Sequence, residues 1–107
     1  MNNEAIKKIA DTYGFSEQSR QLSEECAELI VAVNKYHRGI KKPSHTPSDC
    51  IDKQYLSLQI MEEIADVTIM IEQIKYLLSL NSDDIDLFIE QKLNRQLERI
   101  EKNETNN

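Results

Sequence analysis

Turn-forming residues are scarce in this sequence, whose 107 residues include only two glycines and two prolines. A β-rich domain needs many tight turns, and no segment here alternates apolar and polar residues for long enough to form a strand. The chain is also too short to divide into two domains of ordinary size. We therefore predict one all-α domain, spanning residues 1–107, that consists of a few long helices.

Long apolar runs and metal-type cysteine motifs are missing as well. The longest apolar run, Leu29 to Val33, is far shorter than the about 20 residues that span a bilayer, and the N-terminal residues lack the apolar core of a signal peptide. The two cysteines form no CxxC or Cys/His spacing typical of zinc sites, and we expect Cys26 to be a buried structural thiol. These absences predict a soluble, cytoplasmic protein without a membrane partner.

Positive charge is in deficit, with 13 basic residues against 19 acidic ones and a formal net charge of -6. Duplex nucleic acid is a polyanion, so a chain of this charge is not expected to bind it unaided. An anionic substrate would require metal ions to offset the repulsion.

The pattern of apolar residues and helix-end signals predicts four helices, over about residues 3–13, 16–38, 51–80 and 82–102. Gly14 and Gly39 supply C-terminal stops, and Ser16 and Ser82 offer N-caps. Residues 40–49 are predicted to be a polar loop and residues 103–107 a disordered tail. The expected architecture is a four-helix bundle-like domain.

Two acidic pairs, Glu25-x-x-Glu28 and Glu63-x-x-Asp66, lie inside strongly apolar helical segments. A spacing of three places both carboxylates of a pair on one helix face, and two packed helices would gather all four. Oxygen-only clusters suit Mg²⁺ or Mn²⁺. Di-iron bundles need Glu-x-x-His pairs instead, and neither histidine of this chain follows a glutamate by three.

The predicted core stripes run beside these acids. At about 100° per residue, Glu25 borders the stripe of its helix, whereas Met70 and Leu77 extend the apolar arc past Glu63 and Asp66. Burying a carboxylate costs several kcal/mol unless it is paired or metal-bound, so a purely solvated charged face is the weaker interpretation. The stripes are Leu22, Cys26, Leu29, Ile30, Val33 and His37 on one helix, and Ile60, Ile64, Val67, Ile71, Ile74 and Leu78 on the other.

The segments Glu24 to Leu29 and Glu62 to Val67 resemble the paired E-x-x-E and E-x-x-D signature of the MazG-like, all-α nucleoside triphosphate pyrophosphohydrolases. The resemblance implies hydrolysis of an NTP or dNTP to the monophosphate and pyrophosphate, in housekeeping of the nucleotide pool. It also implies that the catalytic metal ligands are Glu25, Glu28, Glu63 and Asp66, which would hold Mg²⁺, with Mn²⁺ as a possible substitute. The interval between the motifs is longer than usual in the family, which makes residues 40–54 an enlarged loop.

Candidate phosphate contacts are Lys35 and a basic stripe of Lys92, Arg95 and Arg99 on the last helix. The family resemblance supports Lys92 and Arg99, although Gln96 stands where the family tends to carry Asn. The alternative role for the stripe is compensation of the helix dipole together with salt bridges to neighbouring glutamates.

The helix over 51–80 is apolar nearly all round, because Met61, Ala65, Ile69 and Tyr76 cover the side opposite Glu63 and Met70. We therefore expect a homodimer or homotetramer that packs through this helix, as the resemblance also implies. Two other classes stay open: a non-catalytic helical interaction module, and a protein that binds a nucleotide without cleaving it.

Overall fold

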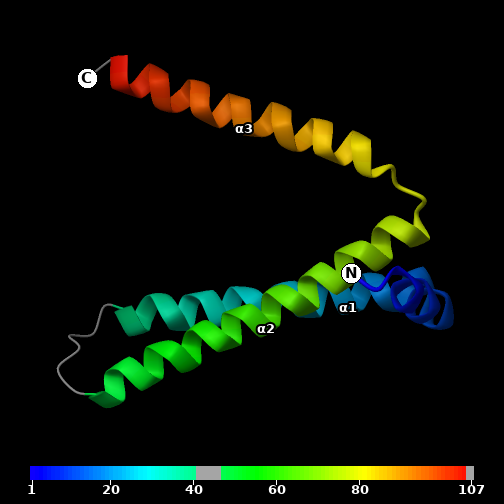
Figure 1. Cartoon of the computed structure of the whole chain (residues 1–107), viewed down its shortest axis with the longest axis horizontal. Helices are drawn as coiled ribbons and strands as arrows, with labels where there is room; N and C mark the ends of the chain where they lie inside the picture. Colours follow the sequence, from blue (N-terminus) through cyan, green and yellow to red (C-terminus); the bar gives the residue numbers. More distant parts are fainter. Residues whose placement is uncertain (41–46, 106–107) are drawn as a thin grey trace.

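Three helices make up the described structure. The computed structural model describes residues 1–40 and 47–105, with side chains over 1–39 and 53–104. The helices are α1 (Asn3–Ile40), α2 (Pro47–Leu77) and α3 (Ser82–Thr105), and the described residues form no strand (Figure 1). The predicted all-α class is confirmed.

Two predicted helix boundaries need correction. α2 begins at Pro47, not near Ile51. Proline disfavours the helix interior, but its fixed φ and missing N–H suit the first helical position. At the other end, α3 continues to Thr105, through most of the predicted tail. Residues 41–46 of the predicted loop and residues 106–107 lie outside the described structure.

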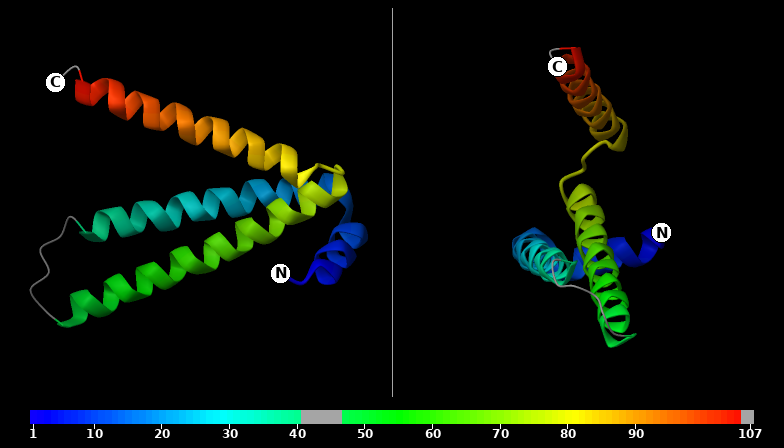
Figure 2. Two further views of the ribbon diagram at one scale, coloured as in Figure 1. Left: turned by 45° about the horizontal axis from the view of Figure 1, so that its top comes forward. Right: turned by 90° about the vertical axis from the view of Figure 1, so that its left-hand side faces the viewer.

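α1 bends at Gly14, where φ is 82° and ψ is 170°. This combination is essentially restricted to glycine, because a Cβ would clash with the backbone. The bend divides α1 into the first two predicted helices, which follow one another without a separate loop. It also turns the N-terminal segment, residues 3–13, back toward the C-terminal end of α2 (Figure 2).

The N-terminal segment is anchored to α2 by both apolar and polar contacts. Ile6 and Ala10 are buried. The Tyr76 hydroxyl donates to the Asp11 carboxylate, at 3.0 and 2.9 Å from its two oxygens. That hydrogen bond, with partial desolvation and the negative charge of Asp11, raises the pKa of Tyr76 above its ordinary value. The phenol therefore keeps its proton, and the bond, throughout the neutral pH range.

α1 and α2 pack against each other as an antiparallel pair, whereas α3 packs against neither. The helix surfaces that face each other include buried Ala32 of α1 and Met70 of α2. Between them the buried amide of Gln18 donates to Gln73 Oε1 at 2.6 Å, so each amide satisfies a polar group of the other. A single chain thus forms a hairpin of α1 and α2, from which α3 extends. The described helices of one chain do not form the predicted four-helix bundle.

The predicted core stripes lie largely outside this hairpin contact. Ile30 and Val33 of α1 are 60% and 47% exposed, and Ile64 and Ile71 of α2 are 49% and 46% exposed. The helices are rotated so that the half-buried sides carrying Glu25 and Glu63 face each other instead. With α3 away from the pair, the described residues cover only half of the twelve stripe positions, and those only partly.

The surface area of the chain confirms its openness. Its accessible surface is 8631 Å², against about 6,100 Å² for a compact monomer of this mass. Its radius of gyration is 18.6 Å, against about 13 Å for a compact domain of this length. A single copy therefore exposes roughly 2,500 Å² more than a compact fold would.

The turn between α2 and α3 is fixed by caps on both helices. Ser79 adopts the left-handed conformation, with φ 54°. Its N–H donates to Tyr76 O at 3.1 Å, and the Leu80 N–H donates to Lys75 O at 2.9 Å, which is the Schellman pattern. Asn81 then caps α3, because its Oδ1 accepts the Asp83 N–H at 2.8 Å, so the cap lies one residue before the predicted Ser82.

Substitution Ser79→Gly should stabilise the protein by about 1 kcal/mol, since glycine adopts the left-handed conformation without the Cβ clash. Urea unfolding followed by circular dichroism measures the difference. The matched control is Ser57→Gly, inside α2, which should destabilise by a similar amount. A loss of stability on Ser79→Gly would contradict the geometry described for this turn.

Candidate metal centre

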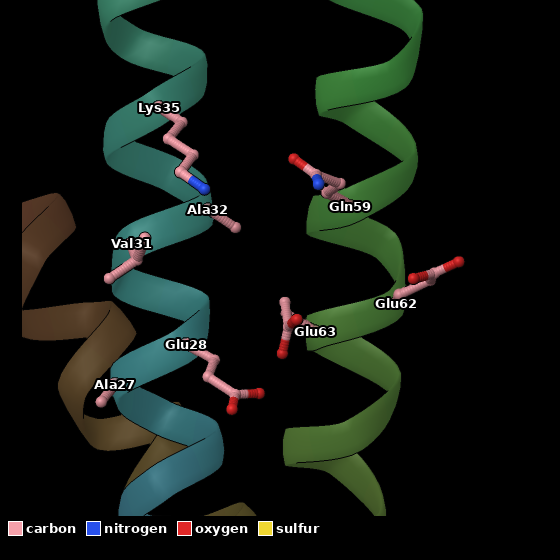
Figure 3. Close-up of a pocket in the computed structure, with 8 residues that line it drawn as sticks. All are labelled: Ala27, Glu28, Val31, Ala32, Lys35, Gln59, Glu62 and Glu63. Carbon is pink, nitrogen blue, oxygen red and sulfur yellow. The ribbon is translucent and has the colours of Figure 1, made fainter.

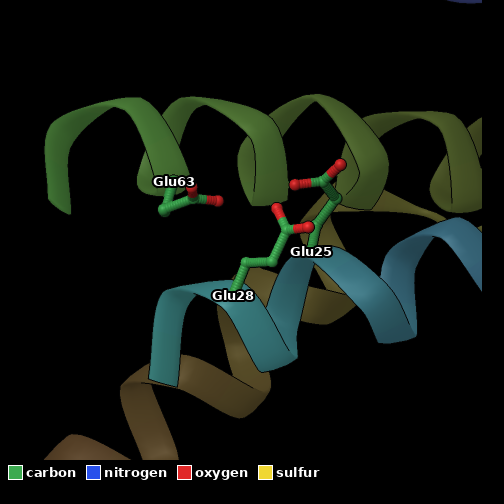
Figure 4. A group of neighbouring side chains, drawn as sticks. All are labelled: Glu25, Glu28 and Glu63. Atoms are coloured by element: carbon green, nitrogen blue, oxygen red, sulfur yellow. The ribbon is translucent and has the colours of Figure 1, made fainter. Parts of the chain in front are cut away.

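Three of the four predicted ligands meet between α1 and α2. Glu25 and Glu28 extend from α1 toward Glu63 of α2 (Figure 4). Each offers a carboxylate oxygen, and these oxygens all lie within 4.8 Å of one another. Glu25 and Glu63 are half-buried and Glu28 is exposed, so the cluster opens to solvent at one side.

The hydrogen bonding of the cluster is incomplete. Gln21 Nε2 donates to Glu25 Oε1 at 2.8 Å and holds that carboxylate in place. Glu25 Oε2 and Glu63 Oε2 are buried and accept no hydrogen bond. No ion pair to any of the three acids is found among the described side chains. A buried carboxylate oxygen without a donor is costly, and a bound cation is one way to satisfy it.

Repulsion within the cluster adds to this cost. Two unit charges about 5 Å apart repel by about 1 kcal/mol even in water-like surroundings, and by more where solvent is excluded. The three carboxylates together offer at least three oxygen donors and a high negative charge. Such a set fits a hard divalent cation, Mg²⁺ or Mn²⁺, with solvent or phosphate oxygens completing the coordination.

Asp66 does not join the cluster. It is exposed, contrary to the prediction that it is embedded in apolar surface, and it is absent from the grouped carboxylates. The side chain of Asp66 is one methylene shorter than that of Glu63 and lies about 60° round the helix from it. Asp66 is therefore an exposed residue one helical turn along α2 from Glu63, outside the cluster.

A cavity of about 320 Å³ adjoins the carboxylates. Figure 3 shows Glu28 and Glu63 directed into the space between the helices, with Lys35 and Gln59 further along and Glu62 directed away from α1. Lys35 therefore lines the same cavity as Glu28 and Glu63, about two helical turns along α1 from Glu28. The lining residues are Ala27, Glu28, Val31, Ala32, Lys35, Gln59, Glu62 and Glu63.

Two amides were missed by sequence reasoning. Gln21 and Gln59 each precede a cluster glutamate by four residues, a spacing that places them on the same helix face. Gln21 binds Glu25, as described above, and Gln59 donates to the Tyr55 hydroxyl at 3.1 Å, on the cavity side of α2. The four-residue spacing was the available signal for both.

The basic stripe of α3 lies far from the cluster within one chain. Lys92, Arg95 and Arg99 are all exposed on a helix that packs against neither α1 nor α2. No residue of the stripe lines the described cavity beside the carboxylates. Any contact of this stripe with a phosphate held at the cluster would need a second chain.

Comparisons with protein-family models, curated proteins and solved structures found no match for this chain. A search of the described helices for a long apolar segment found none able to cross a bilayer.

Proposed function

We propose that this protein is a nucleoside triphosphate pyrophosphohydrolase of the MazG-like type, with Mg²⁺ held by Glu25, Glu28 and Glu63. The observation that carries the proposal is the pair of buried, unpartnered oxygens on Glu25 and Glu63, two of the three carboxylates that meet between α1 and α2. Their chemistry fits Mg²⁺, and an adjoining cavity with a lysine fits a phosphate chain.

The assigned roles follow from the position of each side chain. Mg²⁺ held by these residues would neutralise phosphate charge and lower the pKa of a coordinated water. Glu25, fixed by Gln21, and Glu63 act as ligands through their buried oxygens. Glu28 is more exposed and borders the cavity, so its carboxylate would both bind the cation and accept the proton of the attacking water.

The reaction is attack of water on the α-phosphorus, with cleavage of the bond to the bridging oxygen and departure of pyrophosphate. Lys35 lies seven residues beyond Glu28, about 10 Å along the helix axis, a distance that a triphosphate chain can cover. Its ammonium group attracts the leaving pyrophosphate as a point charge. The family resemblance implies that Asp66 is a fourth metal ligand, but because it is exposed and outside the grouped carboxylates we assign it only a supporting role toward the cation.

Phosphorus NMR of the products tests the proposal. The protein with Mg²⁺ and a panel of NTPs and dNTPs should yield a nucleoside monophosphate and pyrophosphate. A diphosphate with orthophosphate as the first products would contradict the assigned bond cleavage. A nucleotide bound but left intact would instead identify a binding protein, and absence of both binding and cleavage would favour an interaction module.

Lys35→Gln provides the matched variant in this experiment, with Lys8→Gln, an exposed lysine of the N-terminal segment, as its control. If Lys35 contacts the substrate phosphates, Lys35→Gln should raise KM or lower kcat by about tenfold, the value of one exposed charge-assisted contact. If Lys35→Gln and Lys8→Gln are equally active, Lys35 does not contact the substrate phosphates.

A further inference from the structure

The carboxylate of Glu25 is held by a side chain of its own helix. Gln21 lies one turn before Glu25 on α1, and its Nε2 donates to Glu25 Oε1 at 2.8 Å. The direction of this hydrogen bond follows from chemistry, because an ionised carboxylate only accepts and an amide nitrogen only donates. Both side chains are half-buried. One of the two oxygens of Glu25 is therefore already engaged by the protein.

The second oxygen of Glu25 is the one left for a cation. Glu25 Oε2 is buried and accepts no hydrogen bond. A hydrogen bond to one oxygen of a carboxylate also orients the whole group, as outer-shell partners of metal ligands generally do. Gln21 thus makes Glu25 a donor of one oxygen in a fixed orientation.

Glu25 differs in this respect from the other two members of the cluster. Gln59 precedes Glu63 by the same four residues, but its Nε2 donates to the Tyr55 hydroxyl at 3.1 Å and not to the carboxylate. Glu28 is exposed. Of the three clustered carboxylates, only that of Glu25 accepts a hydrogen bond from a described side chain.

The part of α1 that carries Gln21 is itself anchored to α2. Gln18, one turn earlier, is buried and donates to Gln73 Oε1 at 2.6 Å. This pair fixes the two helices against each other beside Gln21. The amide of Gln21 therefore reaches Glu25 from a rigid support, which is the condition for holding a metal ligand precisely.

Mg²⁺ and Ca²⁺ place different demands on carboxylate ligands. Mg²⁺ requires near-ideal octahedral geometry and keeps several of its waters. Ca²⁺ takes about six to eight oxygens in flexible geometry and readily uses both oxygens of one carboxylate. A glutamate restricted to one oxygen therefore suits Mg²⁺ and withholds a donor from Ca²⁺.

We propose that Gln21 sets the metal preference of the cluster, favouring Mg²⁺ over Ca²⁺ by leaving Glu25 a single free oxygen. This role rests on the metal centre proposed above, and it makes Gln21 a positioning residue that contacts the ligand and not the cation. Both ions carry the same charge, so repulsion among the three carboxylates does not distinguish them. Discrimination comes from the number and rigidity of the oxygen donors.

Thermal unfolding over a range of Mg²⁺ or Ca²⁺ concentrations, at constant ionic strength and without nucleotide, gives an apparent dissociation constant for each ion. Wild-type protein should bind Mg²⁺ at least as tightly as Ca²⁺. Gln21→Met keeps an unbranched side chain of similar helix propensity but cannot donate the hydrogen bond. It should weaken Mg²⁺ binding about tenfold without weakening Ca²⁺ binding, which shifts the ratio of the two constants by about tenfold.

Two further variants separate donation from a general effect of the substitution. Gln59→Met removes the matching amide of α2, which donates to Tyr55, so the ratio should stay that of the wild type. Gln21→Lys keeps a donor at this position but adds a positive charge. Both ions should then bind more weakly while their ratio remains near the wild-type value.

An unchanged ratio in Gln21→Met would overturn the proposal even if both affinities fall, because equal losses indicate only a weakened site. A shift of the same size in Gln59→Met or Gln21→Lys, a wild type that prefers Ca²⁺, or a wild type that binds neither ion would also overturn it. Hydrolysis is not measured in this experiment. A protein that shows the expected ratios but leaves nucleotides intact would retain this role for Gln21 and lose the proposed enzymatic function.

Discussion

Glu63→Gln is expected to abolish Mg²⁺-dependent hydrolysis of nucleoside triphosphates while leaving the helices intact. Its buried Oε2 has no hydrogen-bond partner, and it is the only member of the three-carboxylate cluster supplied by α2. Loss of an outer-shell partner typically costs metal sites 10–100-fold, so loss of a ligand should lower kcat/KM by at least about 100-fold. Steady-state kinetics with coupled detection of pyrophosphate, alongside far-UV circular dichroism, measures the effect.

Glu24→Gln is the matched control. Glu24 directly precedes Glu25 in the chain, but it is exposed and is not one of the three clustered carboxylates. It should retain activity. Asp66→Asn tests whether Asp66 is a metal ligand. The sequence motif assigns four equivalent ligands, whereas the structure groups only Glu25, Glu28 and Glu63. We expect Asp66→Asn to lower kcat/KM by about tenfold, which is a smaller loss than that expected for Glu63→Gln. Wild-type turnover by Glu63→Gln would refute the proposed site.

Magnesium is expected to stabilise the folded protein strongly. A cation that binds only the native state at 100 times its dissociation constant adds about 2.7 kcal/mol to the free energy of unfolding. Thermal unfolding with Mg²⁺ should therefore occur several degrees higher than with a chelator. Mn²⁺ should give the same effect, and K⁺ at equal ionic strength should give none.

Glu25→Gln separates metal binding from general salt screening. Removing one of three mutually repelling carboxylates should stabilise the metal-free protein by about 1 kcal/mol and remove most of the response to Mg²⁺. A Glu25→Gln variant that responds to Mg²⁺ like the wild type would show that the ion binds elsewhere. This measurement needs no substrate, so it tests the metal centre even if the proposed hydrolysis fails.

Several features followed directly from the order of residues. Sparse glycine and proline with helical periodicity predicted an all-α chain, and Gly14 was correctly identified as a break between two helical segments. The three-residue spacing of the acidic pair predicted that Glu25 and Glu28 share one face of their helix. These are local properties, set by backbone conformation and by 3.6 residues per turn.

Local pattern could not decide the rotation of one helix against another. On α2 the stripe of Ile64 and Ile71 was predicted to be core, but the surface with Met70 and Gln73 faces α1. A helix that is apolar nearly all round has several equivalent ways to pack, so periodicity alone cannot select one. The selected rotation brings Glu63 to Glu25 and Glu28 and leaves Asp66 exposed.

The sequence by itself thus determined the helices, their apolar stripes and the acidic pairs, because each depends on interactions within a few turns of one helix. Only the tertiary structure decided that three carboxylates meet, that Lys35 lines the adjoining cavity and that α3 stands apart from the hairpin. Those outcomes depend on contacts between residues distant in the chain, such as Gln18 with Gln73 and Asp11 with Tyr76. Their free energy comes from packing and mutual hydrogen bonding across helices, which no single segment encodes.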